Sequence, residues 1–187
     1  MHIATAHLKS VSCYSQSRYH QTEKLPKELA DDYERRTWAE RLHINKDGNI
    51  FIPPMSFKHA IAEAAKFNSR KIPGERNATW TKHFEAGILV IDPLVLPMKK
   101  EDAEPEWLFL DSNGKRGSGT RVMRCYPLIR EWKGKVEFFV TDDKITKDIF
   151  TTYLKEAGMY IGIGRFRVRN LGFYGRFEVV KVGWKTA

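Results

Sequence analysis

Two segments of the chain place apolar residues at intervals of three and four, which is the spacing of an amphipathic helix. Residues 55–67 have this pattern, and Ser56 is expected to cap the helix because its hydroxyl can accept a hydrogen bond from a first-turn amide. The second helix is expected to begin at Thr146 and to end at Gly158. The pattern therefore predicts two helices that pack on a core and lie far apart in the chain.

Strands are predicted where apolar and polar residues alternate, or where short runs are rich in Val, Ile and Phe. The expected strands are residues 3–14, with a bend near residues 9–10, and residues 86–96, 135–140 and 174–184. Residues 86–96 are almost continuously apolar, which is typical of a central strand. Residues 42–52 predict a hairpin around Asp47-Gly48.

Apart from two insertions, these elements occur in the order strand, helix, strand, strand, helix, strand. This is the split βαβ plan, so the expected class is α+β, with a ferredoxin-like or RRM-like antiparallel sheet and two helices on one face. The first insertion is a charge-dense stretch at residues 15–52, in which residues 31–40 have the pattern of a short surface helix. The second is a thumb-like hairpin at residues 98–130. The length suits one domain over residues 1–187.

The composition is that of a folded protein in a reducing compartment. Apolar residues make up 42% and charged residues 29%, a balance typical of globular chains. No apolar run reaches the roughly 20 residues that cross a bilayer, and no signal-peptide core opens the chain. Cys13 and Cys125 suit neither a disulfide framework nor a zinc site, and the six histidines lack metal-ligand spacing. We therefore expect a cytoplasmic protein without membrane contact, metal or cofactor.

Basic residues outnumber acidic ones by 32 to 23, and the resulting net charge of +9 favours a polyanionic partner. Much of the excess lies in two clusters without acids, within residues 112–130 and residues 164–177. Their members are Lys115, Arg116, Arg121, Arg124 and Arg130 in the first cluster, and Arg165, Arg167, Arg169 and Arg176 in the second. Because both clusters also contain glycines and aromatics, they have the composition of a nucleic-acid surface.

The usual motifs of nucleotide-dependent and hydrolytic enzymes are absent from the sequence. Gly162-x-Gly164 begins like a dinucleotide fingerprint, but Arg167 replaces the third glycine and the motif follows a helix instead of a strand. No Walker motif, nucleophile elbow or zinc-protease helix is present. The predicted strands also lack the aromatic signature of a standard RNA-recognition motif. Enzymes of these common kinds are therefore not expected.

Two further motifs occur in a fixed order along the chain. The first is Ile50-Phe51-Ile52-Pro53-Pro54-Met55-Ser56-Phe57-Lys58-His59-Ala60-Ile61. The second is the loop Gly162-Ile163-Gly164-Arg165, continued by Asn170-Leu171-Gly172-Phe173-Tyr174-Gly175-Arg176. The pair resembles the RAMP superfamily, most of all the crRNA-binding backbone subunits of CRISPR effector complexes, and the hairpin at residues 98–130 is similar in place to their thumb. A stand-alone or virus-encoded relative is equally compatible with these motifs.

The resemblance implies sequence-independent binding of single-stranded nucleic acid, RNA more than DNA, by subunits that associate head to tail along the strand. The residue types suit this chemistry, because glycines let the backbone approach a phosphate, arginine forks match its oxygens and aromatic faces stack on bases. The expected binding residues are Lys58, Lys115, Arg116, Arg121, Arg124, Gly162, Gly164, Arg165, Arg167, Arg169, Tyr174 and Arg176. The competing explanations are that Phe173 and Tyr174 fill the core, and that Lys58 is an ordinary solvated lysine.

Two other functions remain open at this point. Some RAMP relatives cleave RNA with an aspartate between the first strand and first helix, or with a histidine near the N-terminus. The candidates for that role here are Asp31, Asp32 and His20, although none sits in a recognisable motif. The basic surface would equally suit a module that binds an acidic protein.

Overall fold

The computed structural model of the protein describes residues 1–113, 117 and 119–186. Over these residues the chain forms an α+β fold whose named strands pair antiparallel, as the sequence predicts. The strands are β1 (His2–Ser10), β2 (Tyr14–Ser15), β3 (Asn49–Ile52), β4 (Ile88–Leu89), β5 (Leu94–Lys99), β6 (Glu104–Asp111), β7 (Arg121–Ile129), β8 (Lys133–Val140) and β9 (Phe177–Thr186). The helices are α1 (Ala30–Thr37), α2 (Pro54–Asn68), α3 (Thr81–Ala86) and α4 (Lys147–Glu156), and a π-helical turn (Ala157–Ile161) extends α4.

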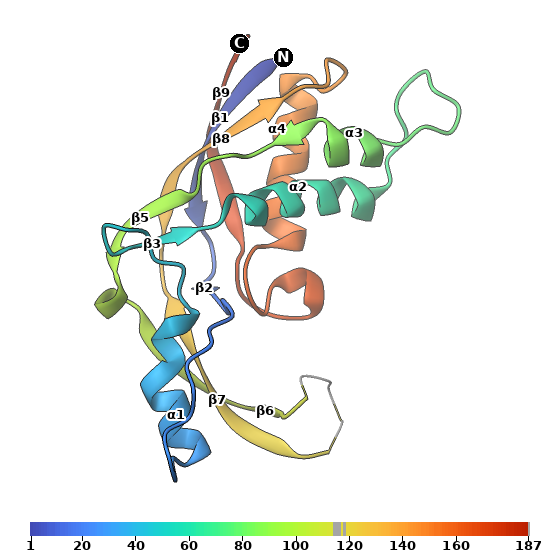
Figure 1. The fold of residues 1–187 in the computed structure, drawn as a ribbon. Coiled ribbons are helices and arrows are strands. Elements are labelled where there is room, and N and C mark those ends of the chain that lie inside the picture. The colour runs from blue at the N-terminus through green and yellow to red at the C-terminus, as the bar shows by residue number, and fades with distance from the viewer. Residues whose placement is uncertain (114–116, 118, 187) are drawn as a thin grey trace.

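The largest sheet has the strand order β4-β8-β1-β9 (Figure 1). Side chains of β1 alternate between its two faces: Ala4, Ala6 and Leu8 are buried, whereas His7 and Lys9 are exposed. Smaller sheets pair β3 with β5 and place β7 between β2 and β6. One face of the main sheet therefore builds the core, and the other meets solvent.

Helices α2 and α4 cover the same face of the main sheet. The ring of Phe57 in α2 lies 6.2 Å from that of Phe177 in β9, and the ring of Phe150 in α4 lies 5.1 Å from that of Phe138 in β8. Because Phe138 pairs with Ala4, these contacts are on the buried side. In Figure 1 no helix lies over the opposite face of the sheet.

Strands β6 and β7 form a long hairpin that projects away from the main sheet (Figure 1). Helix α1 packs against β7 and buries the carboxylate of Glu34, which is 1% exposed. This carboxylate accepts hydrogen bonds from Arg124 at 2.7 Å, from Arg41 at 3.1 Å and from the amide of Cys125 at 3.1 Å. The charge-dense insertion thus supports the base of the hairpin, although its sequence indicates only a surface helix.

The predicted helices are confirmed, but two of their ends differ from the prediction. Ser56 lies inside α2 and Pro53 holds the N-cap position, because two prolines fix the helix start without a side-chain cap. Thr146 caps α4, as predicted, and accepts from the amide of Ile149. Gly158 does not end the helix. A Cβ there would lie 2.0 Å from the carbonyl oxygen of Phe177, so this glycine lets the π-helical turn contact β9.

Two of the predicted strands are divided in the structure. Residues 86–96 give the short edge strand β4 and then β5, which belongs to another sheet, so the prediction of one central strand is wrong. Pro93 separates them and has no amide hydrogen to donate to a ladder. The first predicted strand ends at Ser10, with its irregularity between His7 and Leu8, and its last residue, Tyr14, begins β2. The hairpin at residues 42–52 contains β3 and one isolated bridge.

Candidate nucleic-acid interface

The glycine-rich loop, residues 162–176, joins the π-helical turn to β9 and is held against the chain's N-terminal segment. The amide of Arg165 donates to the carbonyl of Ser15 at 2.9 Å, and the amide of Gly175 donates to the carbonyl of Cys13 at 2.7 Å. Gly162 and Gly164 have positive φ angles of 72° and 77°, a region that favours glycine. The predicted loop is therefore an ordered structure with backbone ties at both ends.

Gly164 is the position where the lack of a side chain matters most for the placement of this loop. A Cβ on Gly164 would lie 2.4 Å from the ring of Tyr14 and 2.5 Å from the carbonyl oxygen of Ser15. Tyr14 is fully buried and cannot give way. Gly164 thus lets the loop lie against β2.

Gly164→Ala is expected to lower the free energy of unfolding by about 2–4 kcal/mol, because it adds a clash to an unfavourable backbone conformation. Urea unfolding followed by circular dichroism measures this change. Gly74→Ala is the control, since Gly74 has a φ of 83° but no atom within 4 Å of an added Cβ. A Gly164→Ala variant no less stable than Gly74→Ala would show that the loop can move freely away from Tyr14.

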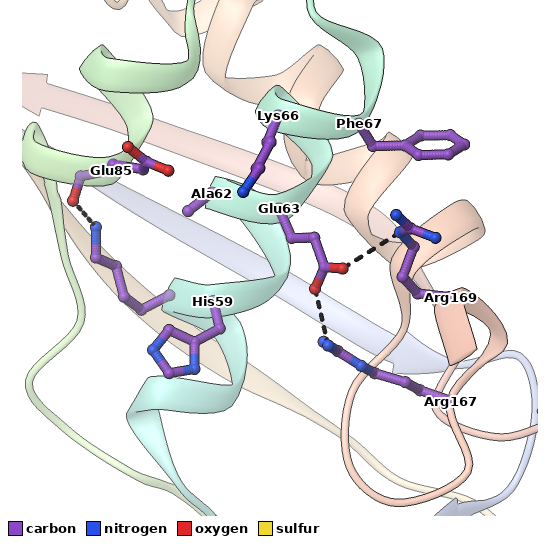
Figure 2. Close-up of a pocket in the computed structure, with 9 residues that line it drawn as sticks. His59, Ala62, Glu63, Lys66, Phe67, Glu85, Arg167 and Arg169 are labelled. Carbon is purple, nitrogen blue, oxygen red and sulfur yellow. Dashed lines mark hydrogen bonds and ion pairs between the residues drawn. The ribbon is translucent and has the colours of Figure 1, made fainter.

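The loop brings two arginines to the outer side of α2, where they border an open groove of about 730 Å³ (Figure 2). The carboxylate of Glu63 holds both of them, Arg167 at 2.8 Å and Arg169 at 3.2 Å. The guanidinium of Arg169 also lies 5.0 Å from the ring centre of Phe67. The groove is lined by Lys58, His59, Ala62, Glu63, Lys66, Phe67, Glu85, Arg167 and Arg169, so four cationic residues share it with two carboxylates.

Lys58 lines the same groove but is not a simple solvated lysine. Its ammonium donates to the carbonyl of Phe84 at 3.1 Å and to the carbonyl of Glu85, both at the C-terminal end of α3. Burial lowers the pKa of Lys58, although the nearby Glu85 carboxylate opposes this shift. Lys58 therefore binds the end of a neighbouring helix while bordering the groove.

Aromatic side chains of the loop differ in their exposure to solvent. Phe173 is 71% exposed and packs edge-on against Phe166, so the explanation that it fills the core does not hold. Tyr174 is half-buried, and its hydroxyl donates to Glu106 on the hairpin. Burial, together with the bond to Glu106, raises the pKa of Tyr174 to about 12. Phe173 is thus free to stack on a base, whereas Tyr174 ties the loop to the hairpin.

Arg165 points inward, unlike Arg167 and Arg169. Its side chain is 12% exposed, and its guanidinium lies 3.7 Å from the ring centre of Tyr126 and 3.9 Å from the Glu106 carboxylate. Burial lowers the pKa of Arg165, against the effect of these two neighbours. Its backbone and side chain border a small hollow that includes His43 and Ser56.

The remaining basic candidates are dispersed. Arg124 binds Glu34, Arg121 lies 5.0 Å from the ring centre of Phe109, and Arg176 donates to the carbonyl of Met159 at 3.1 Å. Lys115 and Arg116 lie outside the described residues. The structure therefore collects Lys58, Arg167 and Arg169 in one groove and leaves the hairpin arginines elsewhere.

The candidates for catalysis lie apart from this groove, in or next to α1. Asp31 and Asp32 are exposed in the first turn of α1, where acids stabilise a helix N-terminus. His20 stacks on Tyr33 and borders a separate hollow with Glu40. Burial, followed by the charge of Arg41, lowers the pKa of His20. Over residues 1–113, 117 and 119–186, no group of three or more His, Cys, Asp or Glu residues could hold a metal ion.

Several groove residues have no place in the sequence prediction. His59, Glu63 and Phe67 follow one another at intervals of four on the side of α2 away from the core, and Lys66 lies three residues after Glu63. A polar stripe of this kind is ordinary on a surface helix, so the spacing alone does not reveal a site. Only the approach of Arg167 and Arg169 from the loop distinguishes this stripe from that of an ordinary surface helix.

The part of the chain that the structure describes contains no helix long and apolar enough to cross a membrane. No protein-family model matches the chain, and no curated protein matches its sequence.

Solved structures nevertheless share the fold. A chain of the type III-B Cmr-beta structure, determined bound to cognate target RNA, is similar over 98% of this chain with a TM-score of 0.59 and 12% identity. The present chain spans 60% of the length of that one. Cmr6 from Pyrococcus furiosus matches over 96% of this chain and 99% of its own, with a TM-score of 0.49 and 14% identity. The resemblance to the RAMP superfamily that the two motifs indicate is thus confirmed as a likeness of fold.

Proposed function

We propose that this protein binds single-stranded RNA without sequence specificity, as a RAMP-like subunit of a CRISPR-type ribonucleoprotein. The strand runs along the groove between α2 and the glycine-rich loop, with Arg167 and Arg169 on its phosphates. The order β4-β8-β1-β9 supports a ferredoxin-like core beneath this surface.

The observation that carries the proposal is the convergence of Lys58, Arg167 and Arg169 from distant parts of the chain on one open groove. Both arginines bind a single carboxylate, that of Glu63, so their positive charge is only partly neutralised. These ion pairs border an open groove, where a phosphate can compete with Glu63 for the same guanidinium forks.

The surroundings of the groove favour a single strand. Phe173, and the partly exposed Phe166 against which it packs, offer flat faces on the same loop, on which unpaired bases can stack. Stacking of this kind tolerates every base, and phosphate contacts carry no sequence information. Together they account for binding that is strong at low salt and independent of sequence.

Changing Arg167 and Arg169 together to Gln is expected to reduce the slope of log affinity against log salt by about 1.4, because each phosphate contact on a single strand contributes about 0.7. If the affinity at 1 M salt is unchanged, binding at 0.1 M falls roughly 25-fold. Fluorescence anisotropy with an unstructured RNA measures both quantities. The matched control changes the exposed Lys71 and Arg76 to Gln.

Glu63→Gln separates a phosphate site from a purely structural ion pair. If the arginines contact phosphate, removing their competing carboxylate tightens RNA binding, whereas a structural pair gives no gain. Unaltered binding in both the double arginine variant and Glu63→Gln would refute the proposed site. Analysing the same mixtures on a denaturing gel reveals cleavage, and Asp31→Ala with Asp32→Ala would then test the nuclease alternative.

A further inference from the structure

The main sheet has an uncovered face on the opposite side from α2 and α4 (Figure 1). Exposed lysines are dense on this face. Its basic members are His7 and Lys9 in β1, Lys133 and Lys135 in β8, and Lys181 and Lys185 in β9. All six are exposed. They lie outside the two basic clusters of the sequence. Alternation along three separate strands brings them together on one face of the folded sheet.

The register sets two lysines directly opposite each other, because Lys133 pairs with Lys9. In the neighbouring row Lys135 and Lys181 both pair with His7, one from each side. Like charges at directly opposed positions destabilise a sheet. This face therefore retains an unfavourable arrangement that a bound polyanion would relieve.

Few carboxylates compensate these charges. Glu137 lies 3.3 Å from Lys135, and Glu178 lies 3.5 Å from Lys9. Among the residues that the structure describes, no carboxylate comes within ion-pair distance of Lys133, Lys181 or Lys185. The face thus keeps a net positive charge after its internal pairs are formed.

The lysine array leads into a groove of about 650 Å³ with apolar walls. Two lysines and two carboxylates border this groove, namely Lys9, Lys133, Glu131 and Glu178, and Leu96, Met98 and Trp132 also line it. A nucleic-acid strand places charged phosphates beside apolar base faces, which matches a row of lysines beside an apolar groove. A peptide of acidic residues alone, such as polyglutamate, has no apolar side chain to place against these walls.

We propose that this face is a second nucleic-acid-binding surface, which contacts the phosphate backbone through Lys133, Lys135 and Lys181 and receives a base in the adjoining groove. It does not depend on the groove beside α2, because it lies across the sheet and uses none of the same residues. The two surfaces allow one protein to contact two segments of RNA, or two strands.

The test compares two triple variants with the same change of charge. In the sheet variant, Lys133, Lys135 and Lys181 are changed to Gln. In the control variant, the same change is made at three exposed lysines on the helical side, Lys82, Lys147 and Lys155. The sheet variant is expected to reduce the salt slope for a long unstructured RNA by about 2, and to lose about 100-fold in affinity at 0.1 M salt if binding at 1 M is unchanged. Its urea midpoint should not fall, because repulsion is removed. Equal binding by both variants would overturn the proposal.

Lysine acetylation followed by mass spectrometry locates the contact directly. Bound RNA is expected to protect Lys133, Lys135 and Lys181 but not Lys82, Lys147 or Lys155. The Arg167 and Arg169 double variant should keep this protection. Loss of RNA binding at the groove beside α2 can therefore be told apart from loss of RNA binding at the sheet face. If polyglutamate protects the sheet lysines and RNA does not, the surface binds acidic protein and the proposal is wrong.

Discussion

Glu34→Ala is expected to lower the free energy of unfolding by about 3–5 kcal/mol, the usual cost of removing one partner from a buried ion pair. The Glu34 side chain is 1% exposed and serves three donors. Its loss leaves the amide of Cys125 buried without an acceptor and leaves Arg41 and Arg124 without their carboxylate. Urea unfolding measures the change.

The same carboxylate gives stability a defined dependence on pH. Burial alone would raise the pKa of Glu34, but the amide of Cys125 and the guanidinium of Arg124 outweigh it and lower the pKa below its ordinary value of 4.5. A depressed folded-state pKa stabilises the protein above the unfolded-state value, and this stability is lost as the pH falls through the folded-state pKa. Glu34→Gln, which cannot ionise, should therefore show a flatter loss of stability below about pH 4.5.

Asp32→Ala is the matched control, because Asp32 is an exposed acid on the same helix and its loss should cost less than about 0.5 kcal/mol. Hydrogen exchange distinguishes global from local effects, since detachment of α1 would expose the amides of β7 first. A Glu34→Ala variant as stable as Asp32→Ala would mean that α1 does not hold the hairpin.

The sequence predicts local structure well and fails where a distant contact decides the outcome. The apolar spacing of α2 and the cap of α4 are local features, and both predictions are confirmed. The sequence predicts a helix stop at Gly158 because glycine commonly is one, yet its role here is close contact with β9. The sequence does not distinguish Glu34 from an ordinary surface acid, because its three donors come from residues up to 91 positions away.

In the candidate site, too, the sequence predicts the kind of residue but not the direction of its side chain. Arg167 and Arg169 are recognisable as loop arginines between glycines, and the structure places them on an open groove. Arg165 has the same local sequence signal but turns inward onto Tyr126, a residue of the distant hairpin. Composition identifies a basic loop, whereas the direction of each side chain depends on packing between segments far apart in the chain.

Assembly along RNA is the second large effect that we expect. The hairpin projects from the domain (Figure 1). Phe109 in β6 is exposed, and its ring centre lies 5.0 Å from the guanidinium of Arg121. We propose that this hairpin reaches over the RNA strand bound by the next subunit. Each interface then joins two different surfaces, so the subunits form an open row and not a closed ring. Particle mass should therefore grow with RNA length, from one subunit on about 10 nucleotides to several on about 60.

Three acids at the start of the hairpin already have partners within the chain. Glu104 binds Arg130 at 2.7 Å, Glu106 accepts from Tyr174, and Asp102 accepts from the amide of Lys99. Because these acids are already used within the chain, the exposed pair of Phe109 and Arg121 is the better docking element. Light scattering of Phe109→Ser with Arg121→Glu should show one subunit on both RNA lengths, with binding to the short RNA retained.

Ile91→Ser removes another exposed apolar side chain, outside the hairpin, and should leave assembly intact. The effect of the hairpin variant would then be specific to that element rather than to surface hydrophobicity. Since α1 holds the hairpin at its base, a folded Glu34→Gln variant should also assemble poorly while still binding short RNA. If the unaltered protein gives one subunit per strand on both RNA lengths at saturation, the hairpin has no role between subunits and head-to-tail assembly is wrong.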